Sequence, residues 1–174
     1  NLIEQADRKE QHAELSLNPG MPGSELQISE EKKMYSSDFY SFANLKGRMN
    51  WPVSKGKIVN SFGENRNKVL NTVTINYGID IQPSSDNNVK AVARGIVSAV
   101  EWIPGYGSVI IITHNEDFRT VYGHLSEIFV EEGDRVKESQ VIATVSEDLE
   151  GRILHFEVWN SRVNQDPEIW LTGK

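Results

Sequence analysis

Several features are missing from this 174-residue sequence, and each absence excludes a class of protein or site. Cysteine is absent, so disulfides and thiolate metal sites are excluded. No apolar run approaches the roughly 20 residues that a membrane-spanning helix needs, so we expect no membrane span. Basic residues are few: 18 Lys and Arg stand against 25 Asp and Glu, a net charge of −7. We therefore expect no nucleic-acid partner, because such an interface needs a basic face to replace phosphate counterions.

The first 50 residues are polar and interrupted, and they predict a helical arm that precedes the main domain. Residues 2–10 are good helix formers with a weak apolar stripe, a pattern typical of the tail of a longer coiled coil. The proline- and glycine-rich residues 18–23 interrupt any helix and predict a hinge. Two short helices are expected after the hinge, the second over residues 37–46.

Residues 51–174 are rich in β-branched side chains and punctuated by glycine, and they predict a second domain. Short apolar segments alternate with turn-forming ones, without long helices between them. This pattern predicts a mainly β fold, an antiparallel β sandwich with a barrel-like core. The expected strands cover residues 57–62, 72–75, 78–81, 89–93, 95–100, 108–113, 120–124, 135–136, 141–145 and 153–159.

Three of the four histidines fall in the β region, and two of them have distinctive neighbours. His124 lies in Tyr-Gly-His-Leu and His155 in Leu-His-Phe-Glu, while Asp80 ends the segment Asn-Tyr-Gly-Ile-Asp. Taken singly, each residue has a simpler interpretation: Asp80 as a turn residue, and His124 and His155 as hydrogen-bonded histidines of the core. His114 stands beside three polar residues and is most simply a loop histidine.

Six elements in a fixed order resemble the lysostaphin-like (LytM) peptidoglycan metallopeptidases. That family carries His-x-Gly-x-Asp, Ala-x-x-x-Gly-x-Val, Gly-Tyr-Gly, Tyr-x-His-Leu, Gly-x-x-Val and His-Leu-His-Phe-Glu. The matching segments here are residues 76–80, 93–97, 105–107, 122–125, 133–136 and 153–157. The resemblance covers about residues 51–171, and six ordered elements make a chance match improbable. It implies the LytM peptidase fold and one groove lined by Asp80, His124 and His155.

Two departures from the family pattern affect the metal site. The resemblance implies that Asp80 and His155 keep two zinc-ligand positions and that His124 keeps a helper position. Asn76 replaces the third ligand and Ile153 the general base, whose contribution is typically about 10²–10⁴-fold. A catalytic zinc takes three protein ligands and an open water position, and an amide substitutes poorly for imidazole. We therefore expect a degenerate, non-catalytic peptidase without zinc or another cofactor, with a vestigial groove formed by Asn76, Asp80, His124, Ile153 and His155.

The entry to the β domain narrows the resemblance to EnvC-type murein hydrolase activators. Residues 42–53 read Phe-Ala-Asn-Leu-Lys-Gly-Arg-Met-Asn-Trp-Pro-Val, and the pairs at 62–63, 166–167 and 170–171 fit the same pattern. The resemblance implies a periplasmic protein that switches on an N-acetylmuramoyl-L-alanine amidase during cell division, with peptidoglycan as a further binding partner. It also implies a coiled coil that engages a membrane division complex. In a chain that begins at Asn1 we expect only the tail of that coil, no signal peptide and a monomer.

The aromatic residues ahead of the β domain suggest a regulatory hypothesis. Phe39, Tyr40 and Phe42 lie on the predicted helix that follows the hinge. Such a helix, laid across the groove with these side chains as apolar anchors, would occlude it. The alternative is a helix that packs on the β domain elsewhere.

Three other functions stay open at this stage. The first is an active zinc endopeptidase that has recruited His114 or Glu157 as a replacement ligand. The second is a carrier module, because residues 132–142 resemble half of a lipoyl-type motif and His124 and His155 are candidates for a phosphohistidine pair. A suitable lysine at a hairpin tip is lacking. The third is a wall-binding module that grips peptidoglycan without activating an enzyme.

Overall fold

The computed structural model describes residues 40–173 of the chain. The chain divides into two units, Asn1–Ser41 and Phe42–Lys174. The predicted coiled-coil tail, the hinge, the first of the two short helices predicted after it, and Phe39 lie outside the described residues. The description that follows therefore concerns the second unit.

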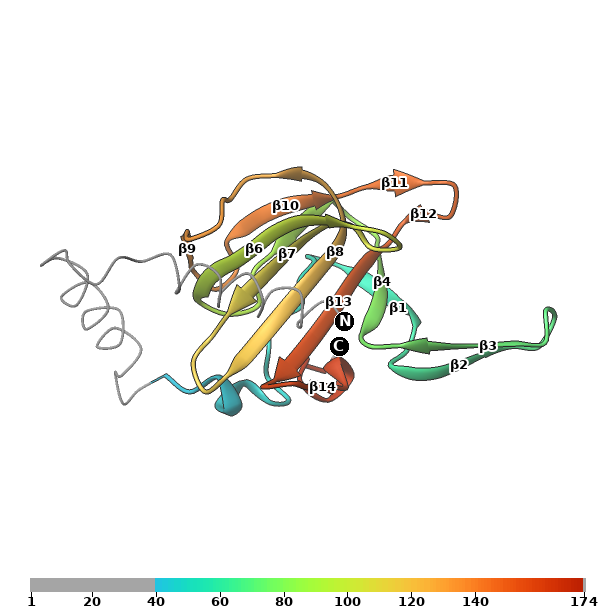
Figure 1. The fold of residues 1–174 in the computed structure, drawn as a ribbon, viewed down its shortest axis with the longest axis horizontal. Coiled ribbons are helices and arrows are strands. Elements are labelled where there is room, and N and C mark those ends of the chain that lie inside the picture. The colour runs from blue at the N-terminus through green and yellow to red at the C-terminus, as the bar shows by residue number, and fades with distance from the viewer. Residues whose placement is uncertain (1–39, 174) are drawn as a thin grey trace, which may run out of the picture. The chain divides into compact units, whose positions relative to one another are not determined.

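The second unit is built from short strands that pair antiparallel (Figure 1). Seven strands follow one another across the main sheet in the order β1-β4-β13-β8-β7-β6-β9; β10 pairs with β8 and β5, and β14 pairs with β13. The prediction of a mainly antiparallel β domain is confirmed. The strands are β1 (Gly56–Asn60), β2 (Gly63–Asn67), β3 (Thr72–Asn76), β4 (Ile79–Pro83), β5 (Asn88–Lys90), β6 (Gly95–Ile103), β7 (Gly107–Thr113), β8 (Phe118–Ile128), β9 (Arg135–Val136), β10 (Val141–Val145), β11 (Glu147–Asp148), β12 (Gly151–Arg152), β13 (Leu154–Asn160) and β14 (Val163–Gln165).

The centre of the sheet is buried on both faces. Strand β13 lies between β4 and β8, and its residues from Leu154 to Trp159 are all buried. Strand β4 shows the alternation of a strand with one covered face, because Ile79 and Ile81 are buried while Asp80 is partly exposed. Burial of a large aliphatic side chain contributes about 1.5–3 kcal/mol. Each strand of this centre is therefore held in a fixed register, and so are the polar residues that it carries.

The predicted helix over residues 37–46 is represented, within the described residues, by a single 3-10 turn, η1 (Phe42–Leu45). The aromatic ring of Phe42 is fully buried, with ring centroids 4.6 Å from Phe118 and 4.6 Å from His114. The backbone N–H of Phe42 donates to Asn115 Oδ1 at 3.1 Å. These contacts hold the turn against the β domain. Among the described residues the helices are η1 and η2 (Pro167–Ile169), and none is long and apolar enough to cross a membrane.

A hairpin of β2 and β3 extends away from the main sheet (Figure 1). Its two strands form a separate two-stranded sheet, and most of their side chains are exposed. Strand β3 was predicted from its β-branched residues, whereas β2 was not, because Gly-Glu-Asn-Arg-Asn lacks the apolar alternation of a half-buried strand. The short strands β11, β12 and β14 were missed as well. The hairpin stands beside the site described next.

Candidate functional site

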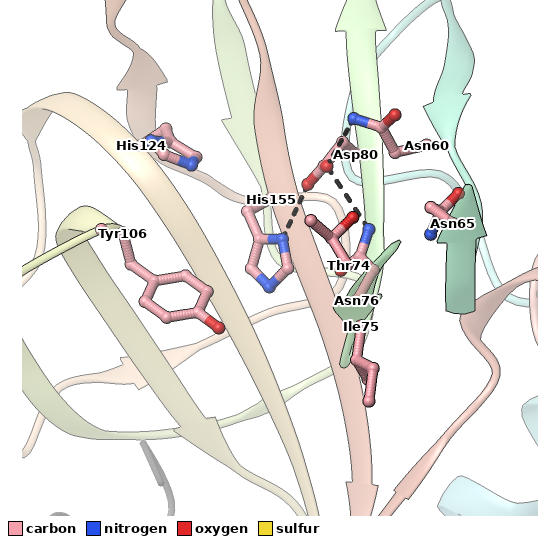
Figure 2. A pocket seen from close by; sticks show the side chains of 10 residues that line it. Asn60, Asn65, Thr74, Ile75, Asn76, Asp80, Tyr106, His124 and His155 are labelled. Atoms are coloured by element: carbon pink, nitrogen blue, oxygen red, sulfur yellow. Dashed lines mark hydrogen bonds and ion pairs between the residues drawn. The ribbon is translucent and has the colours of Figure 1, made fainter. Parts of the chain in front are cut away.

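A polar pocket lies between the β2–β3 hairpin and the main sheet, with a volume of about 270 Å³ (Figure 2). It brings together four of the five predicted groove residues, Asn76, Asp80, His124 and His155. Asn76 and Asp80 come from the consecutive strands β3 and β4, whereas His124 on β8 and His155 on β13 lie far along the sequence. The full set of lining residues is Asn60, Asn65, Thr74, Ile75, Asn76, Asp80, Gly105, Tyr106, His124 and His155.

Asp80 is the meeting point of the side chains on the pocket floor (Figure 2). It is the register partner of Asn60 on β1 and of His155 on β13. Its Oδ1 accepts from His155 Nδ1 at 2.7 Å, and its Oδ2 accepts from Asn60 Nδ2 at 2.9 Å and from Asn76 Nδ2 at 3.3 Å. Side chains from β1, β3 and β13 therefore fix one carboxylate on β4.

The turn that joins Asn76 to Asp80 depends on Gly78. A Cβ atom at this position would lie 2.1 Å from the backbone oxygen of Phe156, so a side chain would force β3 and β4 away from β13. Gly78 also donates its N–H to Asn76 Oδ1 at 3.1 Å. The glycine of the Asn-x-Gly-x-Asp motif thus sets both the spacing and the orientation of the two polar side chains.

His155 lies between two carboxylates. Its Nδ1 faces Asp80, and its Nε2 lies 2.8 Å from Glu157 Oε1. Glu157 is buried, and its second oxygen accepts from Trp159 Nε1 at 2.5 Å. Ionised carboxylates only accept hydrogen bonds, so this arrangement favours a ring with hydrogen on both nitrogens. The network runs from the pocket floor into the core along β13.

The carboxylates of Asp80 and Glu157 determine the charge of His155. Burial acts to lower the pKa of His155, but its hydrogen bonds to Asp80 and Glu157 and their negative charges outweigh burial and raise the pKa to about 9. Burial acts to raise the pKa of Asp80, yet the hydrogen bond and charge of His155, with the Asn60 amide, hold the pKa below its usual value. Near neutral pH the pair is therefore an aspartate and an imidazolium.

His124 and Tyr106 form the opposite wall of the pocket (Figure 2). The backbone of His124 adopts a φ of +58°. This conformation is strained for a residue other than glycine and costs about 1 kcal/mol. Its N–H donates to the Tyr106 carbonyl at 2.7 Å, and its own carbonyl accepts from the Ser146 backbone N–H at 2.8 Å. Burial and the nearby charge of His155 lower the pKa of His124. These bonds hold His124 at the pocket, with its ring centroid 6.4 Å from that of His155.

Other residues singled out by the sequence lie away from the pocket lining. Ile153 is half-buried just before β13, two residues from His155. His114 is buried in the core, where its Nδ1 lies 2.7 Å from the Arg94 carbonyl and its Nε2 2.8 Å from Thr120 Oγ1. Phe42 packs against His114 and Phe118, so its ring belongs to the core and does not line the pocket. Whether an arm with Phe39 and Tyr40 covers the groove stays a prediction.

Six of the ten lining residues were not among the predicted groove residues, and two of these six, Asn60 and Tyr106, contact Asp80 or His155. Asn60 was not singled out, because its role depends on the β1–β4 register, which aligns it with Asp80 and which the sequence does not reveal. Tyr106 was quoted only as part of Gly-Tyr-Gly, although its ring centroid lies 4.9 Å from that of His155. The glycines on either side of Tyr106, both with positive φ, were the available signal of an aromatic residue presented by a tight turn.

The side chains of the pocket are arranged for hydrogen bonding. Within residues 40–173, no group of three or more His, Cys, Asp or Glu side chains is arranged to hold a metal ion. The side-chain amide of Asn76 turns an N–H donor toward Asp80. Both nitrogens of His155 are engaged with carboxylate oxygens. The side chains of Asn76 and His155 therefore present hydrogen-bond donors to the neighbouring carboxylates.

Proteins similar to this chain in sequence or in structure include two murein hydrolase activators and a chain of a pore forming complex. The murein hydrolase activator EnvC of Escherichia coli (strain K12) is 30% identical over 151 residues, which cover 86% of this chain and 35% of EnvC. The murein hydrolase activator NlpD of the same strain is 37% identical over 110 residues, which cover 62% of this chain and 27% of NlpD. A chain in the structure of the SpoIIQ–SpoIIIAH pore forming complex is similar with a TM-score of 0.62 and 27% identity, covering 74% of this chain and 92% of that chain. The present chain thus spans about a third or less of EnvC and NlpD.

The sequence also matches the profile of peptidase family M23 over residues 74–167. This segment contains Asn76, Asp80, His124 and His155, and it makes up more than half of the chain. The order of motifs that resembles the LytM peptidases, the antiparallel fold and the profile match agree, and the chain belongs to peptidase family M23.

Proposed function

We propose that this domain is a non-catalytic activator of a peptidoglycan hydrolase, namely an N-acetylmuramoyl-L-alanine amidase, in cell-wall remodelling and cell division. It acts in the periplasm, where murein is accessible, and binds its partner through the vestigial groove. The observation that carries the proposal is the pocket floor: a peptidase site in which Asn76 donates a hydrogen bond at a ligand position and both nitrogens of His155 are occupied.

The donor set does not fit a catalytic zinc centre. Such a centre takes three protein ligands with an open position for water. Asp80 and His155 are two ligand types, but their polar atoms are committed to each other and to neighbouring amides and carboxylates. We therefore propose that the domain works without zinc and without another cofactor.

The residues considered as replacement ligands have other partners. His114 is buried, bonded to the Arg94 carbonyl and Thr120, and burial lowers its pKa to about 4. Glu157 bonds His155 and Trp159. An active endopeptidase that uses either residue would have to break these buried hydrogen bonds. The activator function needs no such rearrangement.

The surface around the pocket suits recognition of a polypeptide. The floor is polar, while Ile75 on its wall is 67% exposed and Tyr77, next to Asn76, is exposed as well. Polar floors bind main-chain groups, and exposed apolar side chains beside them give anchors for a partner segment. The relatives EnvC and NlpD carry the name murein hydrolase activator, which supports a hydrolase as the partner.

The direct test is release of dye from labelled peptidoglycan by a purified amidase, with and without the full chain. We expect the chain to stimulate the amidase and to release nothing alone. Ile75→Asp should weaken stimulation about tenfold, because it places a charge at the centre of the proposed interface. Val163→Asp is the matched control: Val163 is 61% exposed on β14 and does not line the pocket, so this variant should stimulate normally.

Other outcomes of this assay separate the competing functions. Dye release by the chain alone would identify a hydrolase and contradict the proposal. Binding to purified sacculi without any stimulation of the amidase would identify a wall-binding module. Normal stimulation by both Ile75→Asp and Val163→Asp would exclude Ile75 from the interface, while leaving the activator function itself uncontradicted.

A further inference from the structure

The carboxylate of Asp80 on the pocket floor is stabilised by hydrogen bonds from side chains of the pocket lining. Asp80 lies partly buried, and both of its oxygens are occupied: Oδ1 by His155, and Oδ2 by the side-chain amides of Asn60 and Asn76. A buried carboxylate left without such partners would be strongly destabilising. These three side chains therefore do for Asp80 what a bound cation does in a metal centre.

The orientation of the Asn76 amide follows from its other partner. A backbone N–H only donates, so the atom that faces the N–H of Gly78 at 3.1 Å must be Oδ1. The Nδ2 group consequently faces Asp80. An imidazole at this position of the family motif offers a lone pair, whereas Asn76 offers a hydrogen, which is the opposite polarity.

We propose that Asn60 and Asn76 form an amide clamp that replaces a metal ion, and that they act as positioning residues for the pocket floor. They hold Asp80, which holds His155, whose far side is fixed by Glu157. The side chains of the pocket floor thus form one continuous hydrogen-bond network. This inference rests on the proposed function in one respect, that the groove works without zinc.

The clamp predicts that restoring one ligand does not restore a metal site. In Asn76→His, Asp80 would still accept from Asn60, and this hydrogen bond opposes metal binding through Oδ2. Adding Asn60→Ala frees that oxygen. Because a hydrogen bond to a charged group is involved, we expect the double variant Asn60→Ala/Asn76→His to bind Zn²⁺ about tenfold more tightly than Asn76→His alone.

The experiment is calorimetric titration of the full chain and its variants with Zn²⁺ alone. Asn65→Ala/Asn76→His is the matched control, because Asn65 lines the same pocket but donates to the Ser61 and Gly63 carbonyls instead of Asp80. This control should equal Asn76→His. Should the Asn60→Ala double variant unfold, Asn60→Ser/Asn76→His, which shortens the side chain, serves in its place with the same expected gain.

A spectroscopic measurement separates positioning from a merely structural role. Ring ¹⁵N resonances of His155 should shift in Asn60→Ala, because the clamp sets the carboxylate that His155 faces, and should stay unchanged in Asn65→Ala. Equal zinc affinities for Asn76→His with and without Asn60→Ala, including no binding by either, would overturn the clamp, as would an unshifted His155. Tight zinc binding by the unaltered chain would instead contradict the proposed function along with the clamp.

Discussion

His155 and His114 are both buried histidines of the β domain, and both ring nitrogens of each have a hydrogen-bond partner within 2.8 Å. The partners differ in charge. His155 faces two carboxylates, which raise its pKa to about 9 against the effect of burial. His114 faces a backbone carbonyl and the Thr120 hydroxyl, so burial dominates and lowers its pKa to about 4. Burial alone therefore decides nothing about the charge of a histidine; the charge of its neighbours does.

The same comparison separates a site from a core. The neighbours of His155 open onto the pocket, where Asp80, His124 and Tyr106 are partly exposed. The neighbours of His114 are buried, and they include Phe42 and Phe118. Changes around His114 should alter stability and leave partner recognition intact, whereas changes around His155 should alter both.

The largest effect is expected from Phe42→Ala. It removes a fully buried ring that packs on His114, Phe118 and Trp170, and such truncations typically cost about 3–5 kcal/mol. Urea unfolding at pH 7 measures the loss. The control Phe129→Ala, at a position that is 54% exposed, should cost less than about 1 kcal/mol. Below its unfolding temperature Phe42→Ala should still stimulate the amidase. Loss of stimulation by the folded variant would contradict the prediction that Phe42 contributes to stability alone.

Glu157→Ala should come next, at about 3 kcal/mol, because it leaves His155 buried with one partner missing and frees the Trp159 N–H. The free energy of unfolding is the measurement, with the exposed Glu150→Ala as the control. Unlike Phe42→Ala, this variant should also weaken amidase stimulation at temperatures where it stays folded. Unchanged stimulation would mean that the position of His155 does not matter for the partner.

The two histidines should give stability opposite dependences on pH. The folded pKa of His114 lies below the ordinary value of 6.5, so its contribution is present above pH 6.5 and is lost as the pH falls toward 4, by up to about 3 kcal/mol. The folded pKa of His155 lies above 6.5, so its contribution is present below pH 6.5 and is lost as the pH rises through 9.

The free energy of unfolding, measured by urea titration from pH 4.5 to 9.5, should therefore be largest near neutral pH. His114→Gln should flatten the acid side and leave the alkaline side unchanged, since glutamine does not titrate. If the free energy of unfolding falls as steeply at low pH in His114→Gln as in the unaltered chain, groups other than His114 cause the loss. A flat alkaline side in the unaltered chain would contradict the charged state of His155.

The smallest of these effects is expected from Thr120→Val. The Thr120 hydroxyl lies 2.8 Å from His114 Nε2 and 3.1 Å from the Tyr122 hydroxyl, and valine keeps its shape without the polar atom. Leaving two buried polar groups short of a partner should cost about 1–3 kcal/mol in unfolding free energy. Because the change lies in the core, amidase stimulation should be unaffected. A change in stimulation would mean that the core around His114 is coupled to the pocket around His155.

The sequence predicts the parts of this molecule that depend on local pattern. Strands with β-branched or alternating apolar residues, such as β6, β7 and β13, lie close to their predicted positions. The polar strand β2 has no such pattern, and the order of strands in the sheet is a matter of long-range pairing. The helix expected over residues 37–46 is, within the described residues, a single 3-10 turn whose Phe42 ring packs against Phe118.

The site follows the same division. Asn76, Asp80, His124 and His155 were found because they belong to motifs, and the pocket brings them together. Asn60 lies in no motif, and only the β1–β4 register places it against Asp80. Glu157 was considered as a replacement metal ligand, whereas its partners in the structure are His155 and Trp159, each two residues away on the same face of β13. Alternation along a strand would have suggested that grouping.

The β2–β3 hairpin, which pairs within itself and keeps most of its side chains in solvent, gives this architecture a particular freedom. Its length, tip and outward residues can change without altering the register of the central strands. One wall of the groove can therefore change in length and in its outward side chains while the strands of the floor keep their register. A single scaffold can in this way be matched to many different partners.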